Sequence, residues 1–214
     1  MNIIGVCGQA GAGKDTIADF LVKDHKFVKL SFADPLKRIC HDVFDFSEEQ
    51  LWGPSSARNA EDKRYPRSPF GSEKVTEFLT PRYALQRLGT EFGRDCYAPI
   101  WVELAIRQAK TILEQNVSYD RVRGIIPNLM GPKRGVVIPD VRFRNELEAI
   151  KAAGGKVVRV VRPGAGLEGA AALHPSEVEM QSIPDSDFDR VIVNNGSLQD
   201  LKTKVLVTRT YLCP

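Results

Sequence analysis

The chain has 214 residues, 43% of them hydrophobic, which suits one domain with a sizeable core and allows two at most. Its net charge of +3 is mild and its basic residues are scattered, apart from a group at 121–134, so nucleic acid is not expected as a direct partner. Four cysteines without a C-x-x-C pair argue against zinc or disulfides, and the lack of a long apolar run argues against a membrane protein; both favour the cytoplasm.

The first expected element is a buried parallel strand at 2–7, because its apolar run is nearly continuous. A glycine-rich turn follows, and then an amphipathic helix over 14–24. Gly8, Gly13 and Lys14 fit the phosphate-binding loop G-x-x-x-x-G-K, in which backbone N–H groups and a lysine contact the phosphates. The alternative is a tight turn with a solvated lysine. The residues expected to bind the phosphates are Gly11, Ala12, Gly13, Lys14, Asp15 and Thr16.

The residue after the lysine departs from this motif. It is Asp15, whereas the usual Ser or Thr would contact Mg²⁺ through its hydroxyl, and Thr16 comes one position later. Mononucleotide kinases have similar loops, in which the metal is held largely through water. We therefore expect a Mg²⁺ site whose ligand set stays open, with Asp15, Thr16 and Asp140 as candidates.

The later elements alternate between strands and helices. Further strands are expected at 27–32, 135–139, 156–161 and 189–193. Helices are expected from 35, over 80–114 with one helix ending at Gly89 and the next starting near Pro99, at 144–153 and at 198–207. This order predicts an α/β protein, with a three-layer α/β/α domain and a five-stranded parallel sheet.

Three segments are expected to differ in role. The core would comprise 1–44 and 135–214, and a helical insertion that binds the substrate would span about 45–134. Within it, 45–75 has the composition of a long loop or loosely helical segment. Residues 163–187, rich in Gly, Ala, Pro and Ser, are expected to form a mobile flap.

Polar residues follow the third expected strand, at the sheet edge where such proteins bind ligands. Asp140 has the position of a metal-side carboxylate, Arg142 and Arg144 could neutralise a phosphoryl group, and Glu146 could orient an arginine. The alternative is a helix cap with surface ion pairs. The expected catalytic residues are Lys14, Asp15, Asp140, Arg142 and Glu146.

The helical segment offers a second cluster. Arg82 and Gln86 are four residues apart and share a helix face, where they suit a monophosphate and a base edge. Trp101 either stacks on a base or belongs to the core. The group of His174, Ser176 and Glu177 is a weaker signal, because a lone histidine in a loop is more often exposed than catalytic.

Five segments, in one order along the chain, resemble the phage-type deoxynucleoside monophosphate kinase family. They are GQAGAGKDT at 8–16, SFADPLK at 31–37, LQRLGTEFGR at 85–94, DVRFRNE at 140–146 and HPSE at 174–177. The resemblance implies a phosphate-loop (P-loop) kinase fold and a homodimer that transfers the ATP γ-phosphate to a deoxynucleoside 5′-monophosphate, with Mg²⁺, for DNA precursor synthesis. The substrate-binding positions that it implies are Asp34, Lys37, Arg82, Gln86, Gly89, Thr90, Trp101 and Arg144.

One departure and two alternatives remain. Many nucleotide kinases carry arginines in the flap, but 163–189 contains none, so the charge would come from Arg142, Arg144, Arg162 or the basic segment at 121–134. One alternative is a P-loop kinase of another phosphorylated metabolite, such as phosphomevalonate or dephospho-coenzyme A. The other is a nucleotide-hydrolysing regulatory or DNA-packaging module, which the lack of a concentrated basic face disfavours.

Overall fold

The structure is a computed structural model that describes residues 2–68, 75, 77–129, 131–166 and 175–212. Its contacts divide the chain into two compact units. Unit 1 comprises Met1–Phe32 and Val102–Pro214, and unit 2 comprises Ala33–Trp101. The predicted insertion at about 45–134 overlaps unit 2 over 45–101, whereas 102–134 belongs to unit 1.

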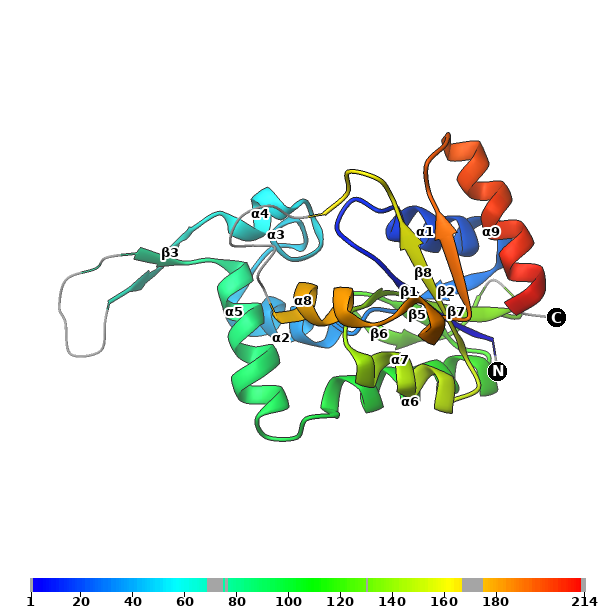
Figure 1. The fold of residues 1–214 in the computed structure, drawn as a ribbon. Coiled ribbons are helices and arrows are strands. Elements are labelled where there is room, and N and C mark those ends of the chain that lie inside the picture. Colours follow the sequence, from blue (N-terminus) through cyan, green and yellow to red (C-terminus); the bar gives the residue numbers. More distant parts are fainter. Residues whose placement is uncertain (1, 69–74, 76, 130, 167–174, 213–214) are drawn as a thin grey trace. The chain divides into compact units, whose positions relative to one another are not determined.

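Unit 1 is built on a five-stranded sheet with the order β2-β7-β1-β8-β9, in which every neighbouring pair is parallel (Figure 1). The predicted five-stranded parallel sheet is therefore confirmed. The sheet strands are β1 (Ile3–Cys7), β2 (Phe27–Lys29), β7 (Gly135–Val141), β8 (Lys156–Val161) and β9 (Arg190–Val193). The other elements are α1 (Lys14–His25), α6 (Ile100–Glu114), β5 (Ser118–Asp120), β6 (Gly124–Ile126), α7 (Arg144–Ala152), α8 (Pro175–Ser182), the 3₁₀ turn η3 (Asp185–Asp187) and α9 (Leu198–Leu212).

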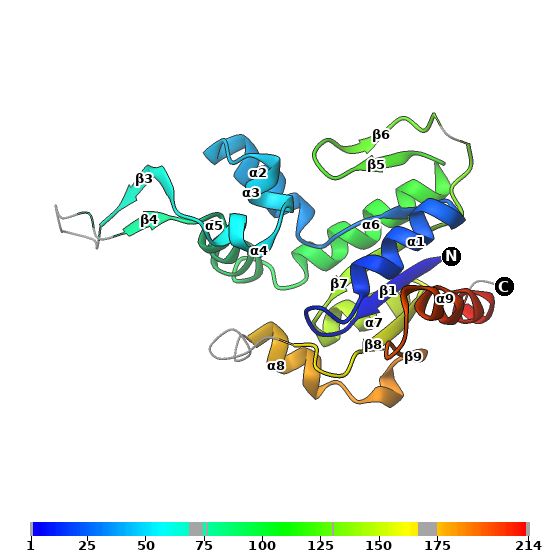
Figure 2. The same ribbon diagram turned by 90° about the horizontal axis from the view of Figure 1, so that it is seen from above.

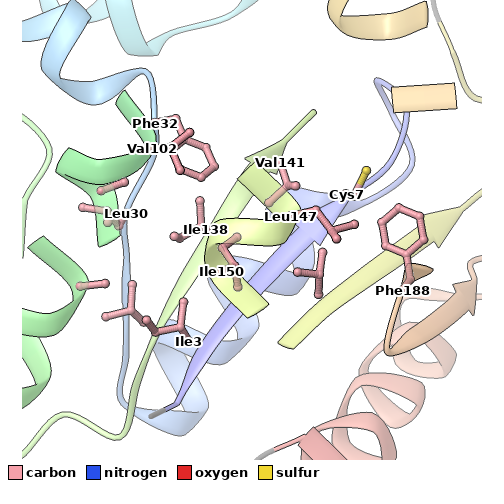
Figure 3. Packing of buried hydrophobic residues seen from close by; sticks show 14 of the residues in the cluster. Ile3, Cys7, Leu30, Phe32, Val102, Ile138, Val141, Leu147, Ile150 and Phe188 are labelled. Atoms are coloured by element: carbon pink, nitrogen blue, oxygen red, sulfur yellow. The ribbon is translucent and has the colours of Figure 1, made fainter. Parts of the chain in front are cut away.

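Helices cover both faces of this sheet, because its central strands are apolar on both sides. All five residues of β1 are buried, as expected for a parallel strand between two helical layers. Helices α1 and α9 pack on one face, and α6, α7 and α8 pack on the other (Figures 1 and 2). Figure 3 shows the second of these layers, where Ile138 of the sheet packs with Leu147 and Ile150 of α7.

Unit 2 has a smaller core of its own, formed by Cys40, Phe46, Leu51, Leu79 and Ala84. Strands β3 and β4 pair antiparallel. The elements of unit 2 are α2 (Asp34–Phe44), α3 (Glu48–Trp52), α4 (Ser55–Asn59), β3 (Asp62–Arg67), β4 (Glu77–Leu79), α5 (Pro81–Arg87) and the π-helix η1 (Leu88–Arg94).

The segment at 45–75 was expected to be a long loop or loosely helical, and where the structure describes it the long-loop alternative is wrong. Two short helices and strand β3 occupy it instead. Helix α3 begins where the Ser47 hydroxyl accepts from the Gln50 N–H and the Gln50 side chain accepts from the Ser47 N–H. Tyr65 secures the strand by donating its hydroxyl to the Phe44 carbonyl at 2.6 Å. This Ser-x-x-Gln pattern, which is typical of a helix start, is visible in the sequence at 47–50.

One other expectation fails locally, and the flap stays a prediction. Gly89 does not end a helix, because α5 continues directly into η1. The expected flap contains α8, whose Met180 is buried in the core of unit 1 together with Ile183 just beyond the helix. Residues 167–174 of that flap lie outside the described residues. Within the described ranges, no helix combines the length and hydropathy that crossing a bilayer requires.

Candidate active site

The turn between β1 and α1 has the backbone of a phosphate-binding loop. Gly8, Gly11 and Gly13 take φ values of 149°, 77° and 104°, a region that residues with a Cβ rarely adopt. A Cβ on Gly8 would also lie 2.4 Å from the Val160 carbonyl oxygen. Helix α1 begins at Lys14, so the positive end of its dipole and its first N–H groups lie at the loop. This geometry suits an anionic group.

Lys14 is held beside the loop in a partly desolvated state. Its Nζ donates a hydrogen bond to the Gln9 carbonyl at 2.8 Å. Burial lowers the pKa of Lys14, and the positive charge of Arg142 lowers it further, while Asp15 and Glu177 act in the opposite direction. The charge of Arg142 therefore acts on Lys14, and Arg142 follows β7, the neighbour of the strand that leads into the loop.

Cys7, the last residue of β1, is a buried free thiol. Burial raises the pKa of Cys7 to about 11. A thiol in this state is a poor nucleophile at neutral pH. Cys7 therefore packs as a small core residue.

Two contacts from other strands brace the loop. The buried side chain of Asn194, just after β9, donates from Nδ2 to the Ala12 carbonyl at 2.9 Å. After β8, the Gly166 N–H donates to the Ala10 carbonyl at 3.1 Å. The sequence indicated Asn194 only as part of a turn. The signal that could have found it is its position at the carboxyl end of a sheet strand, level with the loop.

Asp15 is paired with a lysine. Its carboxylate lies 2.9 Å from Lys29 Nζ, and Asp19 contacts the same ammonium at 3.0 Å. Burial opposes the charge of Lys29, but the hydrogen bonds to these carboxylates raise its pKa overall. Asp15 is largely exposed, so its place among metal ligands remains a prediction.

Asp140 lies inside β7, which runs on to Val141, and not just after a strand that ends at Pro139 as expected. Its Oδ2 accepts from the Ser31 hydroxyl, and its Oδ1 accepts from the Phe32 N–H at 3.2 Å. Strand β7 is the direct neighbour of β1, which leads into the phosphate loop. Asp140 on β7 and Ser31 just after β2 therefore place oxygen atoms at this edge of the sheet.

These oxygens fit Mg²⁺, which prefers one or two carboxylates together with water and substrate phosphates over a cage made only of protein groups. Among the described residues, no three His, Cys, Asp or Glu side chains cluster as such a cage would require. Asp140, with the Ser31 hydroxyl beside it, suits the metal better than Asp15, because Asp15 already neutralises Lys29.

Beyond Asp140, two glutamates hold Arg142. Glu146 is buried and accepts from the main-chain N–H of Arg142 at 2.8 Å and of Phe143 at 3.1 Å. Glu177 carries the ion pair with the guanidinium, at 2.6 Å from Nη1. The expectation that Glu146 orients an arginine side chain stays a prediction, and its hydrogen bonds fix the Arg142 main chain. The sequence indicated Glu177 only weakly, as part of a group with His174 and Ser176.

The neighbouring arginine is engaged elsewhere. The guanidinium of Arg144 lies 2.8 Å from an Asp187 carboxylate oxygen and 3.9 Å from one of Glu148. Its main-chain N–H donates to Glu179 at 3.0 Å. His174 lies outside the described residues, as does the side chain of Ser176.

In unit 2, the first predicted substrate residues surround a tryptophan that the sequence analysis did not single out. Buried Asp34 accepts from Trp52 Nε1 at 2.9 Å. The Lys37 ammonium lies 5.6 Å from the centre of the Trp52 ring. Both residues belong to the first turn of α2, and Trp52 ends α3. This contact fixes the two helices to each other.

The remaining predicted substrate residues lie along α5, η1 and α6. Arg82 donates from Nε to the Asn59 side chain, and Gln86 and Thr90 are exposed. Trp101 is buried and donates from Nε1 to the Gly89 carbonyl at 3.0 Å. The structure thus favours the core reading of Trp101, with its ring packed against η1.

A groove of about 460 Å³ lies on another face of the same helical segment. Among the described residues, Tyr83 and Arg87 line it, whereas Arg82 and Gln86 do not. The Arg67 guanidinium lies 3.7 Å from the centre of the Tyr83 ring at this groove. The predicted acceptor face and this groove are therefore two different surfaces.

A phosphate-binding loop at the carboxyl edge of a five-stranded parallel sheet, with a partly desolvated lysine in it, is the architecture of a P-loop protein that binds phosphates. Solved structures share this fold. The dephospho-CoA kinase of Campylobacter jejuni is 16% identical and matches with a TM-score of 0.52, over 99% of this chain and 97% of that one. At this identity the likeness concerns the fold alone.

The family follows from sequence comparison. Residues 73–205 match the model of the family "Deoxynucleotide monophosphate kinase". The deoxynucleotide monophosphate kinase of Enterobacteria phage T4 is 38% identical over 264 aligned residues, which cover 99% of this chain and 100% of that protein. A protein of Acanthamoeba polyphaga mimivirus, provisionally given the same name, is 35% identical over 96% of this chain and 95% of its own length. The chain belongs to the deoxynucleotide monophosphate kinase family, which confirms the predicted function.

Proposed function

We propose that the chain transfers the γ-phosphate of ATP to a deoxynucleoside 5′-monophosphate, and that the loop after β1 holds the donor. The observation that carries this proposal is the loop itself, whose glycine backbone suits phosphates and which holds a partly desolvated Lys14 on which the charge of Arg142 acts. Phosphoryl transfer requires positioned positive charge more than covalent help from the protein. Lys14 and Arg142 supply such charge where the γ-phosphate would lie.

Mg²⁺, when bound, would offset the charge of the transferring phosphate. Asp140 and Thr16 would hold it, through water or directly, with Asp15 as the third candidate. Ser31 supports Asp140 by donating its hydroxyl to the carboxylate. Asp140 also accepts from a main-chain N–H, so its oxygens are held at a fixed place on β7.

The acceptor would be bound by unit 2. Arg82 suits its phosphate, and Gln86 and Thr90, both exposed, suit a base edge or a sugar hydroxyl. Trp101 would act from within the core, by supporting Gly89 through the hydrogen bond of its indole. Asp34 and Lys37 would support this unit at α2. We also propose a homodimer, which sedimentation analysis of the purified protein would test.

The acceptor identifies the function. A coupled assay that detects ADP, run with each deoxynucleoside monophosphate in turn, should show turnover that depends on the acceptor. Phosphomevalonate and dephospho-coenzyme A serve as alternative acceptors in the same assay. Turnover only with one of these, or hydrolysis of ATP that is independent of any acceptor, would contradict the proposal.

The Arg142→Ala variant tests the role of the second cation. We expect kcat to fall by about 100-fold or more while KM for ATP changes little, because the arginine acts mainly on charge that develops in the transition state. Arg107→Ala, which removes an exposed arginine on α6, is the control and should match the wild type. Equal activity of the two variants would show that Arg142 only forms a surface ion pair and takes no part in catalysis.

A further inference from the structure

The ion pair between Arg142 and Glu177 joins the segment after β7 to α8. Its two partners differ in burial, since the side chain of Glu177 is 4% exposed and that of Arg142 is 41% exposed. A carboxylate is rarely buried unless a cation compensates it. A half-exposed guanidinium, in contrast, keeps part of its surface for other contacts. A buried anion therefore holds a half-exposed cation.

Glu177 also acts on the pair of cations at the phosphate loop. Lys14 and Arg142 repel each other, and the positive charge of Arg142 makes Lys14 easier to deprotonate. The charge of Glu177 opposes this effect. Glu177 therefore offsets a repulsion that the proposed phosphate site creates.

Rigid elements position Glu177. It lies in the first turn of α8, and Met180 and Ile183 anchor that segment in the core of unit 1, each 1% exposed. The main chain of Arg142 is fixed separately, by its hydrogen bond to Glu146. Arg142 is therefore held at both ends, by a buried carboxylate at its main chain and by another at its guanidinium. Such preorganisation is what electrostatic stabilisation of a transition state requires.

We propose that Glu177 is a positioning residue for phosphoryl transfer, which fixes the Arg142 guanidinium in place before the nucleotides bind. This inference rests on the proposed role of Arg142. Glu177 itself touches no substrate in this account. Its effect on catalysis must then pass through Arg142, and that requirement can be tested.

A double-mutant cycle measures this coupling. Glu177→Gln keeps the size of the side chain and an acceptor oxygen but removes the charge. Alone, it should lower kcat by about 10-fold or more with less than about a threefold change in KM for ATP. In the Arg142→Ala background, the same substitution should change kcat by less than about twofold, because its target is absent. Thermal unfolding of each variant monitors the fold.

A matched control lies on the same helix. Glu179→Gln removes a charge two residues away, from a carboxylate that accepts the main-chain N–H of Arg144 at 3.0 Å, and it should leave kcat within about twofold. If Glu177→Gln proves poorly folded, Glu177→Asp replaces it in the cycle. That variant keeps the charge but shortens the side chain, and it should lower kcat in the wild-type background only.

Two outcomes would overturn the inference: no loss of kcat in the Glu177 variants, or an equal loss with and without Arg142. The second outcome would indicate a structural role for Glu177. Failure of the proposed function looks different, because it would appear as normal activity of Arg142→Ala or as absence of acceptor-dependent turnover in the wild type. The wild type and the single Arg142 variant are therefore measured first.

Discussion

At the scale of single residues, the account depends on a lysine that the fold holds partly desolvated. Burial and Arg142 lower the pKa of Lys14, so the folded protein disfavours its charged form. A lysine with a lowered pKa opposes folding while it is protonated. This opposition starts to fall as the pH rises past the lowered pKa and is gone above the ordinary pKa of lysine. Such a cation, kept beside a phosphate loop, indicates a functional role more than a structural one.

Lys14→Met should therefore abolish phosphoryl transfer without loss of the fold. We expect kcat to fall by about 1000-fold or more, and ATP to stop raising the midpoint of thermal unfolding. Without ligand, the variant should lose at most about 1 kcal/mol of unfolding free energy. That is the contribution of the hydrogen bond from Lys14 to Gln9, which the variant lacks. Any stability advantage of the variant should shrink at alkaline pH. Lys23→Ala, at an exposed position on the same helix, is the control, and near-normal turnover of Lys14→Met would refute the assignment.

Asn194 is the second residue whose contact carries a prediction. Asn194→Ala would leave the Ala12 carbonyl without its buried donor, so the free energy of unfolding should fall by about 1–3 kcal/mol. KM for ATP should rise, because the loop loses a brace. Asn195→Ala, at the exposed neighbouring position, is the matched control for chemical denaturation and kinetics. A variant of Asn194 with wild-type KM would show that the loop needs no such support.

The sequence predicted residues of the loop well and its supports poorly. The glycines and Lys14 follow a fixed spacing, and their chemistry is local. Asn194 and Glu177 act through contacts with residues 182 and 35 positions away, so local sequence marks Glu177 only weakly and Asn194 only as part of a turn. Trp52 is similar, since only folding brings it to Asp34.

At the scale of elements, η1 is the least regular part of unit 2. Its π-helical turns include a bond from the Asp95 N–H to the Thr90 carbonyl at 2.9 Å, and Trp101 donates to the Gly89 carbonyl. A Cβ on Gly93 would lie 2.4 Å from the Trp101 ring. The absence of a side chain at Gly93 thus allows the ring to pack on η1. Segments of π-helix are frequent at functional sites.

Gly93→Ala should disturb this element selectively. We expect a loss of about 1–3 kcal/mol in the free energy of unfolding, because the ring or the helix must shift. If η1 contributes to acceptor binding as proposed, KM for the monophosphate should rise more than KM for ATP. Cys96→Ala, at an exposed position beyond η1, serves as the control. Equal changes in the KM values for the monophosphate and for ATP would show that η1 does not contribute specifically to acceptor binding.

Element prediction succeeded where the periodicity was long and failed where elements were short. The strands β1, β7, β8 and β9 appear near their expected positions, because buried parallel strands are continuous apolar runs. Strands β5 and β6 have three residues each and were missed. Helix α8 was not predicted, because the residues before it are rich in small side chains and suggested a flap. Its Met180 nevertheless packs in the core.

At the scale of the whole molecule, two units share the proposed work. Unit 1 contains the phosphate loop, Asp140, Arg142 and Glu177, and unit 2 contains the predicted acceptor residues from Asp34 to Trp101. The order of strands and helices predicted the sheet. The unit boundary at Trp101 was not predicted, because α6 reads as one continuous helix while most of its apolar face packs into unit 1.

The most direct test of the central claim is the stoichiometry of the reaction. Purified protein, ATP, Mg²⁺ and a deoxynucleoside monophosphate are incubated together, and all nucleotides are quantified by chromatography over time. The account predicts one deoxynucleoside diphosphate for each ADP formed, and no ADP formation above background with Lys14→Met. ADP that accumulates without a diphosphate product, or an active Lys14→Met variant, would contradict it.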